Sequence, residues 1–221
     1  MVQKMSSEFL VRIPLERVAV LIGPKGSVKK RIEELTECTL KIDSNSGDVI
    51  ILAEEELENP VSLWKARDMI KAIGRGFSPQ NAYKINDSGS GFDLIQLRDY
   101  VGTSPNSLRE VRSRLIGQKG RTRNTIEQMA GVNISVFGNT IGIVGEFRRL
   151  QFVREGIIRL INGAKHSTVY KYIEERMREL KGDKDKLWIS HAKEEDLVGI
   201  TDLDELERLV FEEEERDASD E

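Results

Sequence analysis

The chain contains an internal duplication, and this feature restricts its possible folds more than any other. A shift of 94 positions places Ile22–Gly26 on Ile116–Gly120. Equivalent residues keep their chemical character well beyond these segments: Lys29 with Arg123, Ile32 with Ile126, Glu33 with Glu127, Leu35 with Met129, Leu40 with Ile134 and Ile42 with Val136. Solenoid repeats are only ~20 to 50 residues long. A chain of 221 residues with this longer period is therefore expected to hold two domains of one kind.

Hydrophobic periodicity and turn residues predict the same order of elements in both copies. In the first copy we expect a strand at Glu8 to Ile13, helices at Leu15 to Ile22 and Ser27 to Thr36, strands at Thr39 to Asp43 and Asp48 to Leu52, and a third helix capped by Asn59 and Pro60. Trp64 and Phe77 are expected in the core of this copy, and the alternative is that they belong to an exposed face that binds a protein partner.

The second copy repeats this order with a shorter hairpin. Its expected elements are a strand at Phe92 to Val101, helices at Ser107 to Ile116 and Thr122 to Ala130, strands at Val132 to Phe137 and Thr140 to Val144, a helix from Phe147 to Ile161, and a further helix from Ser167 to Leu180. Ser107 and Glu110 have the spacing of a capping box. We therefore divide the chain into a first domain (residues 8–85), a linker (86–91), a second domain (92–165), a C-terminal helix packed on the body (166–182) and an acidic tail (183–221).

The net charge of −4 conceals two parts of opposite sign. Residues 183–221 hold sixteen acidic and five basic residues, whereas residues 1–182 hold 29 basic and 22 acidic residues. A polyanion would therefore meet a basic body. The acidic tail is either a solvated end that aids solubility or a segment that shields the basic surface until RNA or a protein partner displaces it.

The two glycine-flanked loops are the candidate ligand sites. Glycine at both ends of a loop between two helices lets backbone N–H groups and a helix N-terminus approach a phosphate chain. Basic residues surround each loop. The candidate RNA-binding residues are Gly23, Pro24, Lys25, Gly26, Lys29 and Lys30 in the first copy, and Arg112, Arg114, Gly117, Gln118, Lys119, Gly120, Arg121 and Arg123 in the second.

The order strand, helix, Gly-x-x-Gly, helix, strand, strand, helix resembles that of the type I KH domain, whose loop holds about four nucleotides of single-stranded nucleic acid. The resemblance implies an α+β fold of two tandem type I KH domains, each a three-stranded antiparallel sheet with three helices on one face. A lone Gly-x-x-Gly has little value. Two copies between correctly ordered elements are a specific signal.

A narrower resemblance covers most of residues 8–180 and is densest in the second copy. It is carried by Arg114 to Arg123, Thr125 to Glu127, Ile143 to Gly145 and Gly163 to Tyr170. These segments resemble the Dim-two family, also called partner of Nob-one, whose members are KH proteins of small-ribosomal-subunit assembly. The resemblance implies recognition of the 3′ region of small-subunit ribosomal RNA, work beside a Nob-type endonuclease, and no bond cleavage by this chain.

The first loop is similar to that of archaeal-type members, because eukaryotic relatives tend to have a degenerate loop there. Lys29 and Arg123 depart from the aliphatic residue that many KH domains carry three positions beyond the second glycine, so base preference stays open. The alternative function is a protein–protein scaffold for an endonuclease or a translation factor, in which one KH copy has lost its RNA. The first copy is the candidate for that role.

Other function classes find little support in the sequence. The two histidines, His166 and His191, and the acidic run Glu212 to Glu215 lack the spacing of a catalytic or metal site, so neither an enzyme nor a cofactor is expected. Cys38 is the only cysteine, which excludes an internal disulfide. No segment reaches the ~20 apolar residues of a membrane span, and we expect a cytoplasmic monomer.

Overall fold

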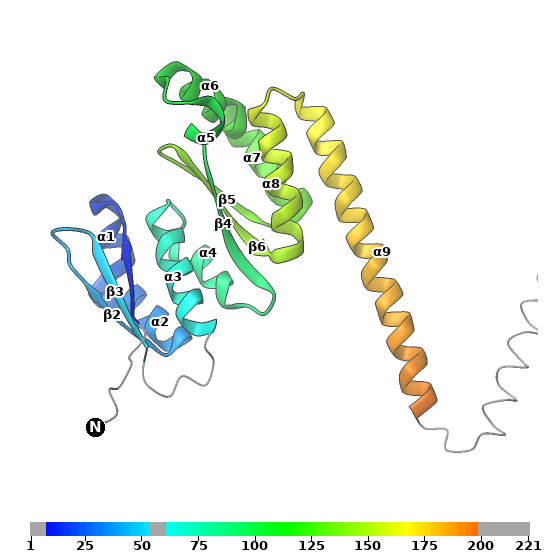
Figure 1. Ribbon diagram of the computed structural model, residues 1–221, viewed down its shortest axis with the longest axis horizontal. Helices are drawn as coiled ribbons and strands as arrows, with labels where there is room; N and C mark the ends of the chain where they lie inside the picture. Colours follow the sequence, from blue (N-terminus) through cyan, green and yellow to red (C-terminus); the bar gives the residue numbers. More distant parts are fainter. Residues whose placement is uncertain (1–7, 54–60, 199–221) are drawn as a thin grey trace, which may run out of the picture. The chain divides into compact units, whose positions relative to one another are not determined.

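The computed structural model describes residues 8–53 and 61–198, with side chains as far as Gly182. The chain divides into a compact unit that ends at Met177 and a second unit that begins at Arg178. Both copies of the duplication lie in the first unit (Figure 1). The predicted cap at Asn59 and Pro60 and residues 199–221 of the predicted tail (183–221) lie outside the described residues.

The first copy folds in the predicted order. Its elements are β1 (Glu8–Arg12), α1 (Leu15–Ile22), the 3-10 turn η1 (Pro24–Gly26), α2 (Ser27–Thr36), β2 (Cys38–Ile42), β3 (Asp48–Ala53) and α3 (Val61–Gly74). The antiparallel sheet has the order β1-β3-β2, with Leu10 opposite Ile50 and Leu40 opposite Ile51. Alternate strand residues such as Val49 and Ile51 are buried, because one face of the sheet packs on the helices.

The connection between the copies contains two short elements that the sequence did not indicate. They are α4 (Pro79–Tyr83) and the 3-10 turn η2 (Lys84–Asn86). Ser78 caps α4 by accepting a hydrogen bond from the backbone N–H of Asn81, and Pro79 fills its first turn. Within the predicted linker at residues 86–91, only residues 87–89 lie between elements, because η2 ends at Asn86 and β4 begins at Ser90.

The second copy has the same topology. Its elements are β4 (Ser90–Gln96), α5 (Arg98–Val101), α6 (Pro105–Ile116), the 3-10 turn η3 (Gln118–Gly120), α7 (Arg121–Ala130), β5 (Asn133–Phe137), β6 (Thr140–Glu146) and α8 (Phe147–Ile161). Its sheet order is β4-β6-β5. The fold class is thus confirmed: two three-stranded antiparallel sheets, each with helices on one face.

Two predictions for the second copy are wrong in detail. The strand expected at Phe92 to Val101 ends at Gln96, because Leu97 has helical φ and ψ angles of −63° and −31° and the chain turns there into α5. The capping box at Ser107 and Glu110 does not form. Ser104 stands at the N-cap instead, and Pro105 supplies a first turn that needs no N–H donor.

The two copies contact one another within the compact unit. The hydroxyl of Ser135 donates to the carbonyl of Arg75 at 2.9 Å, and the Nζ atom of Lys84 donates to Oδ1 of Asn133 at 2.8 Å. Phe77 packs edge-on against Phe92 with 6.2 Å between ring centroids. The prediction of a buried Phe77 is confirmed, and it helps to join the copies. The prediction for Trp64 is wrong, because its side chain is 49% exposed beside Phe9 and Arg67.

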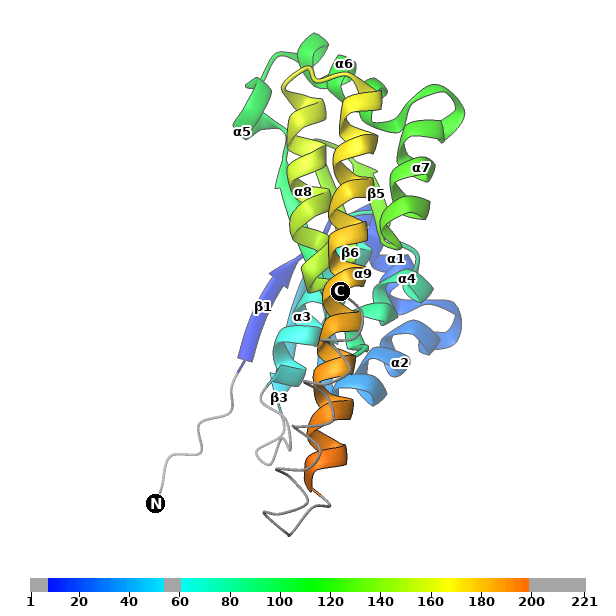
Figure 2. The ribbon, with the colours of Figure 1, turned by 90° about the vertical axis from the view of Figure 1, so that its right-hand side faces the viewer.

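The last helix is longer than predicted. α9 runs from His166 to Val198, whereas the sequence indicated an end near Leu180. Gly182 resembles a C-terminal signal, yet a single glycine costs only about 1 kcal/mol inside a helix and no proline occurs between it and Val198. The first turns of α9 lie beside α8, where Val169 and Ile173 pack against Gly156 (Figure 2). No helix in the described part of the chain is apolar over enough length to cross a bilayer.

Candidate nucleic-acid interface

The two loops have the same backbone conformation. Gly23 and Gly117 have φ angles of 71° and 73°, and Gly26 and Gly120 have φ angles of 78° and 79°. Lys25 and Lys119 both have a φ of 52°, which is uncommon for a residue with a side chain. Each loop is closed by a hydrogen bond of 3.2 Å from the second glycine N–H to the carbonyl of the first. The duplication therefore preserves a specific three-dimensional loop.

The first and second glycines of each loop serve different purposes. A Cβ atom on Gly23 would collide with Val28, and one on Gly117 would collide with Thr122. In contrast, a Cβ on Gly26 would have no heavy atom within 4 Å, and one on Gly120 would meet only Asn124 at 3.8 Å. The first glycine is thus needed for packing. The second leaves open space next to the backbone, where a phosphate can approach.

The lysine of each loop points into solvent. Lys25, Lys30, Lys119 and Arg121 are exposed and form no ion pair with any described residue. Their charges are therefore available to an anionic ligand. The loops differ at one position, because Gln118 offers a backbone N–H and an amide where Pro24 offers neither.

Lys29 and Arg123 are held by acidic residues one turn further along their helices. The closest approach between Lys29 and Glu33, and between Arg123 and Glu127, is 3.7 Å in both copies. The same carboxylates accept hydrogen bonds from the β2 and β5 backbones, as Glu33 does from the N–H of Leu40 at 2.7 Å. These two basic residues are consequently part of a helix-to-strand connection as well as candidates for RNA contact.

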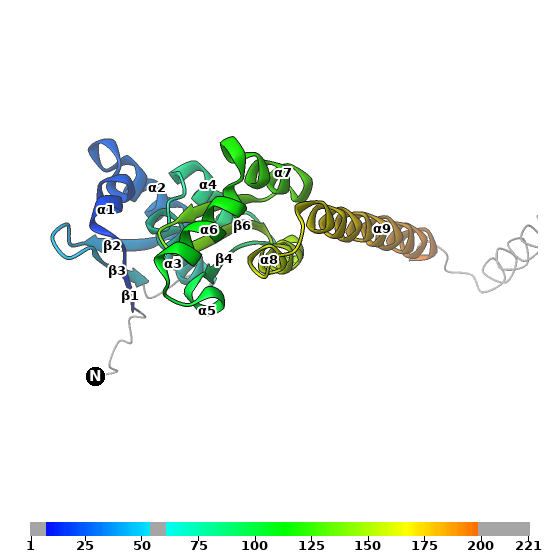
Figure 3. The ribbon, with the colours of Figure 1, turned by 90° about the horizontal axis from the view of Figure 1, so that it is seen from above.

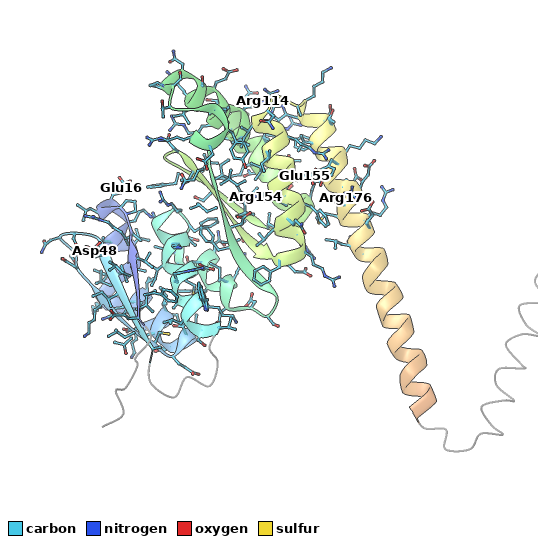
Figure 4. All side chains as sticks on the ribbon, in the orientation of Figure 1. Glu16, Asp48, Arg114, Arg154, Glu155 and Arg176 are labelled. Carbon is cyan, nitrogen blue, oxygen red and sulfur yellow. The ribbon has the colours of Figure 1, made fainter. Side chains whose placement is uncertain are left out.

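Arg112 and Arg114 also form hydrogen bonds to backbone carbonyls of the protein itself. Arg112 donates to the carbonyls of Leu108 and Gly138 at 3.1 and 3.2 Å. Arg114, at the end of α6 nearest the start of α9, donates to the carbonyls of Gly163 and Ala164 at 3.0 and 3.1 Å (Figure 4). Their role in RNA contact stays a prediction, but each has a structural function that the sequence did not reveal.

A polar surface beside the second loop includes residues that the sequence analysis missed. A shallow hollow of about 460 Å³ is lined by Gln118, Lys119, Arg121, Asn124, Thr125 and Gln128. Arg121, Asn124, Thr125 and Gln128 follow the i, i+3, i+4, i+7 spacing of one helix face. The same periodicity that locates apolar faces would have identified this polar one. No cluster of three or more potential metal ligands occurs among the described residues.

An ion pair joins the strand and the helix that support the second loop's domain. The Nη1 atom of Arg154 on α8 contacts both carboxylate oxygens of Asp93 on β4 at 2.6 and 2.8 Å. Hydrogen bonding to Asp93 raises the pKa of Arg154, and burial opposes this effect. The pair therefore connects α8 to the sheet of the second copy.

Comparison with known proteins supports two KH domains. Residues 8–71 match the KH domain family, and residues 91–178 match the eukaryotic type KH domain (KH-domain type I) in the form of the second KH domain of partner-of-Nob-one proteins. The KH domain-containing protein MJ0443 of Methanocaldococcus jannaschii is 41% identical over 179 residues, which cover 81% of this chain and 78% of that protein. The crystal structure of Dim2p from Pyrococcus horikoshii is 43% identical, with a TM-score of 0.71, and the match covers 76% of this chain and 99% of that one. This chain belongs to the Dim2 family of KH-domain proteins.

Two further crystal structures are similar to this chain. APE0754 from Aeropyrum pernix, a protein of unknown function, is 34% identical with a TM-score of 0.80, and the match covers 84% of this chain and 99% of that one. Dim2p from Pyrococcus horikoshii has also been crystallised in a complex with a/eIF2α and rRNA; it is 42% identical with a TM-score of 0.73, over 79% of this chain and 96% of that one. The resemblance to Dim-two proteins is therefore confirmed, including its archaeal type.

Proposed function

We propose that this Dim2 protein binds single-stranded RNA at the 3′ region of small-subunit ribosomal RNA and acts in ribosome assembly without cleaving RNA itself. The observation that carries the proposal is the second loop, where an open Gly120 lies beside the exposed charges of Lys119 and Arg121. Such a surface suits backbone phosphates, which supply much of the affinity for nucleic acids. The rRNA complex of the Pyrococcus relative supports the same ligand class.

In this function the protein presents precursor rRNA to a Nob-type endonuclease in the cytoplasm. Phosphate contacts of the loops position the strand, while cleavage is performed by the partner. The protein acts as a monomer, because two KH domains on one chain already supply two loops for one RNA strand. Linking two binding sites in this way raises the overall affinity without new contacts.

The test is fluorescence anisotropy with an RNA copied from the mature 3′ end of small-subunit rRNA and a scrambled RNA of equal composition, across a salt series. The variant Gln118→Asp with Lys119→Asp should lose binding, and its salt slope should fall by ~0.7 for each phosphate that the loop no longer neutralises. Aspartate tolerates the left-handed conformation at position 119, so the domain should stay folded. Thr39→Asp with Lys41→Asp, which makes the same charge change on the exposed side of β2, is the matched control.

Unchanged binding by the loop variant, or an equally large decrease in the control, would contradict the role of the second loop. Equal affinity for both RNAs would contradict recognition of the 3′ sequence while leaving RNA binding intact. Nuclease activity that copurifies with the wild-type chain and disappears in a loop variant would contradict the non-catalytic role.

A scaffold function for the first copy is the second candidate. The outer face of its sheet exposes Leu10, at 69%, opposite Ile50 on β3. Exposed aliphatic residues grouped on a sheet are typical of a protein contact, and the Pyrococcus relative was crystallised with a/eIF2α as well as rRNA. Leu10→Asp should weaken binding to a/eIF2α by more than tenfold and leave RNA affinity unchanged. Unchanged binding to a/eIF2α together with a lower RNA affinity would exclude this face as the protein-binding surface.

A further inference from the structure

A second cavity lies beside the first loop, on a side of α2 that does not face the sheet. It has a volume of about 850 Å³ and is lined by residues of α1, the loop, α2 and α4, among them Ala19, Val20, Pro24, Arg31, Gln80 and Tyr83. Figure 3 shows α4 next to α2, and the same neighbourhood appears in Figure 2. Like the hollow beside the second loop, the cavity is open to solvent and not enclosed.

This cavity lies away from the side of α2 that contacts β2. Lys29 and Glu33 lie on the side of α2 that faces β2, since Glu33 accepts the N–H of Leu40. Ser27 and Arg31 line the cavity and are one helical turn apart, on another side of the same helix. The cavity therefore occupies the flank of the loop that faces α4.

The short helix α4 is firmly attached, so the cavity has a defined wall. Arg17 on α1 donates to the carbonyl of Ile73 at 2.8 Å and to that of Phe77 at 2.6 Å. Phe77 itself is buried, and α4 begins two residues later. These contacts fix the position from which Gln80 and Tyr83 face α1 and α2.

The lining has the chemistry of a nucleobase site. Ala19, Val20 and Pro24 provide apolar surface, Tyr83 provides a half-buried aromatic ring, and the amide of Gln80 can both donate and accept hydrogen bonds. Burial raises the pKa of Tyr83, with Arg31 opposing the shift, so the ring stays an uncharged phenol at neutral pH. No carboxylate of the described residues lines the cavity, although Arg31 forms an ion pair with Glu34 at 3.3 Å.

The second copy does not reproduce this surface. Its equivalents of Ala19, Val20 and Pro24 are Ser113, Arg114 and Gln118, all polar. Arg114 donates hydrogen bonds to the carbonyls of Gly163 and Ala164, which follow α8. Among the described residues, α8 is followed directly by the long helix α9, and no short helix equivalent to α4 lies between them. The apolar cavity is thus specific to the first copy and does not follow from the KH fold alone.

We propose that this cavity binds one nucleobase of a single-stranded RNA whose neighbouring phosphate rests on Gly23–Gly26. The inference rests on the proposed RNA-binding function and extends it to a base-binding site formed by α4. A nucleotide is favoured over an apolar peptide because Arg31 lines the cavity, and the exposed Lys25 and Lys30 are chain neighbours of the lining residues Pro24 and Arg31. These positive charges would attract the phosphates on either side of the base.

The test measures RNA affinity by fluorescence anisotropy for full-length wild type, Tyr83→Ala, Tyr83→Phe and Gln80→Ala, with the exposed Gln96→Ala on β4 as the matched control. Stacking on an aromatic ring is worth enough for Tyr83→Ala to weaken binding roughly tenfold. Tyr83→Phe and Gln96→Ala should remain within about twofold of wild type. Gln80→Ala should weaken binding by a few-fold, because it removes a hydrogen-bonding group and leaves the stacking surface in place.

A second measurement uses the same RNA with single abasic nucleotides moved along the strand. One abasic position should reduce wild-type affinity roughly tenfold and should have no further effect on Tyr83→Ala. This coupling distinguishes base binding from a loss of folding, which would lower the affinity for every RNA equally. Photo-crosslinking of RNA with 5-bromouridine at that position should label Tyr83.

The outcomes separate this inference from the proposed function. If wild type binds RNA and the second-loop variant does not, while Tyr83→Ala and Gln80→Ala bind as wild type, the cavity has no part in RNA recognition and the inference is wrong. If abasic substitutions act equally on wild type and Tyr83→Ala at every position, the inference is equally overturned. If wild type binds no RNA at all, the proposed function fails and this inference fails with it.

Discussion

Glu127 on α7 accepts a hydrogen bond of 2.7 Å from the backbone N–H of Ile134 on β5. The equivalent residues of the first copy, Glu33 and Leu40, form the same bond at the same distance. A carboxylate therefore connects the helix after each Gly-x-x-Gly loop to the first residues of the following strand. The duplication has preserved the connection that orients this helix, in addition to the loop itself.

Removal of this carboxylate should destabilise the domain. Glu127→Ala leaves a partly buried N–H without its charged partner, so we expect a decrease of about 1.5 to 3 kcal/mol in the free energy of unfolding. Chemical denaturation followed by circular dichroism measures this change. Glu127→Gln, which keeps an acceptor, should be destabilised less. If Glu127→Ala were as stable as wild type, this hydrogen bond would make no net contribution to the free energy of unfolding.

The two glycines of the second loop should respond differently to alanine. Gly117→Ala meets both an unfavourable φ and a collision with Thr122, so it should lower the unfolding free energy by more than about 2 kcal/mol. Gly120→Ala meets open space and carries only the cost of its φ, about 1 kcal/mol. Its larger effect should be on RNA affinity. Urea denaturation and anisotropy of both variants test this, and equal stabilities would contradict the packing role of Gly117.

Local features made the fold predictable from the sequence. The loops, the hairpins and the helices beside them depend on residues close in the chain, such as the apolar positions of α8 and the turn at Gly138. The repeat then supplied a second, independent indication of each element. The missed elements lack such signals: α4 is five residues long, too short for periodicity, and its position depends on Arg17, 60 positions from Phe77 in the chain.

The candidate site was predictable in its loops and less so in its arginines. All four arginines near the second loop were predicted to bind RNA because of their charge: Arg112, Arg114, Arg121 and Arg123. Only the tertiary structure separates the exposed Arg121 from Arg114, whose partners Gly163 and Ala164 are about 50 positions away. Trp64 illustrates the same limit, since its spacing on α3 is that of a core residue, yet it lies on the surface with Arg67 over its ring at 4.4 Å.

Arg114 and Arg121 should therefore have separable effects. Arg114→Ala removes the bonds to the turn after α8, and we expect stability to fall by about 1 to 2 kcal/mol. Arg121→Ala should leave stability within about 0.5 kcal/mol of wild type and reduce the salt slope of RNA binding by ~0.7. Thermal unfolding and anisotropy measure both quantities in parallel. Lower stability in Arg121→Ala with unchanged RNA affinity would reverse these assignments.

The contact between α8 and α9 should make stability depend on pH on the acid side. Tyr172 donates to Glu155 at 2.5 Å, and Arg159 contacts the other oxygen of this carboxylate at 2.5 Å. Figure 4 shows Glu155 on α8 near Arg176 on α9. The hydrogen bond from Tyr172, followed by that from Arg159, lowers the pKa of Glu155 below its ordinary value of 4.5.

The pKa of Glu155 is lower in the folded protein than in the unfolded chain. At a pH between the folded-state and unfolded-state pKa values, the unfolded chain therefore binds more protons than the folded protein. The stabilisation from Glu155 is fully present above pH 4.5 and disappears as the pH falls through the folded-state pKa. Glu155→Gln should therefore unfold at a lower temperature than wild type at pH 7, and the difference should shrink below pH 4.5. Calorimetric melting curves from about pH 7 to about pH 3 measure it, with Glu174→Gln on the exposed side of α9 as the control. A difference that stays constant over this range would show that the carboxylate charge is not what stabilises the contact.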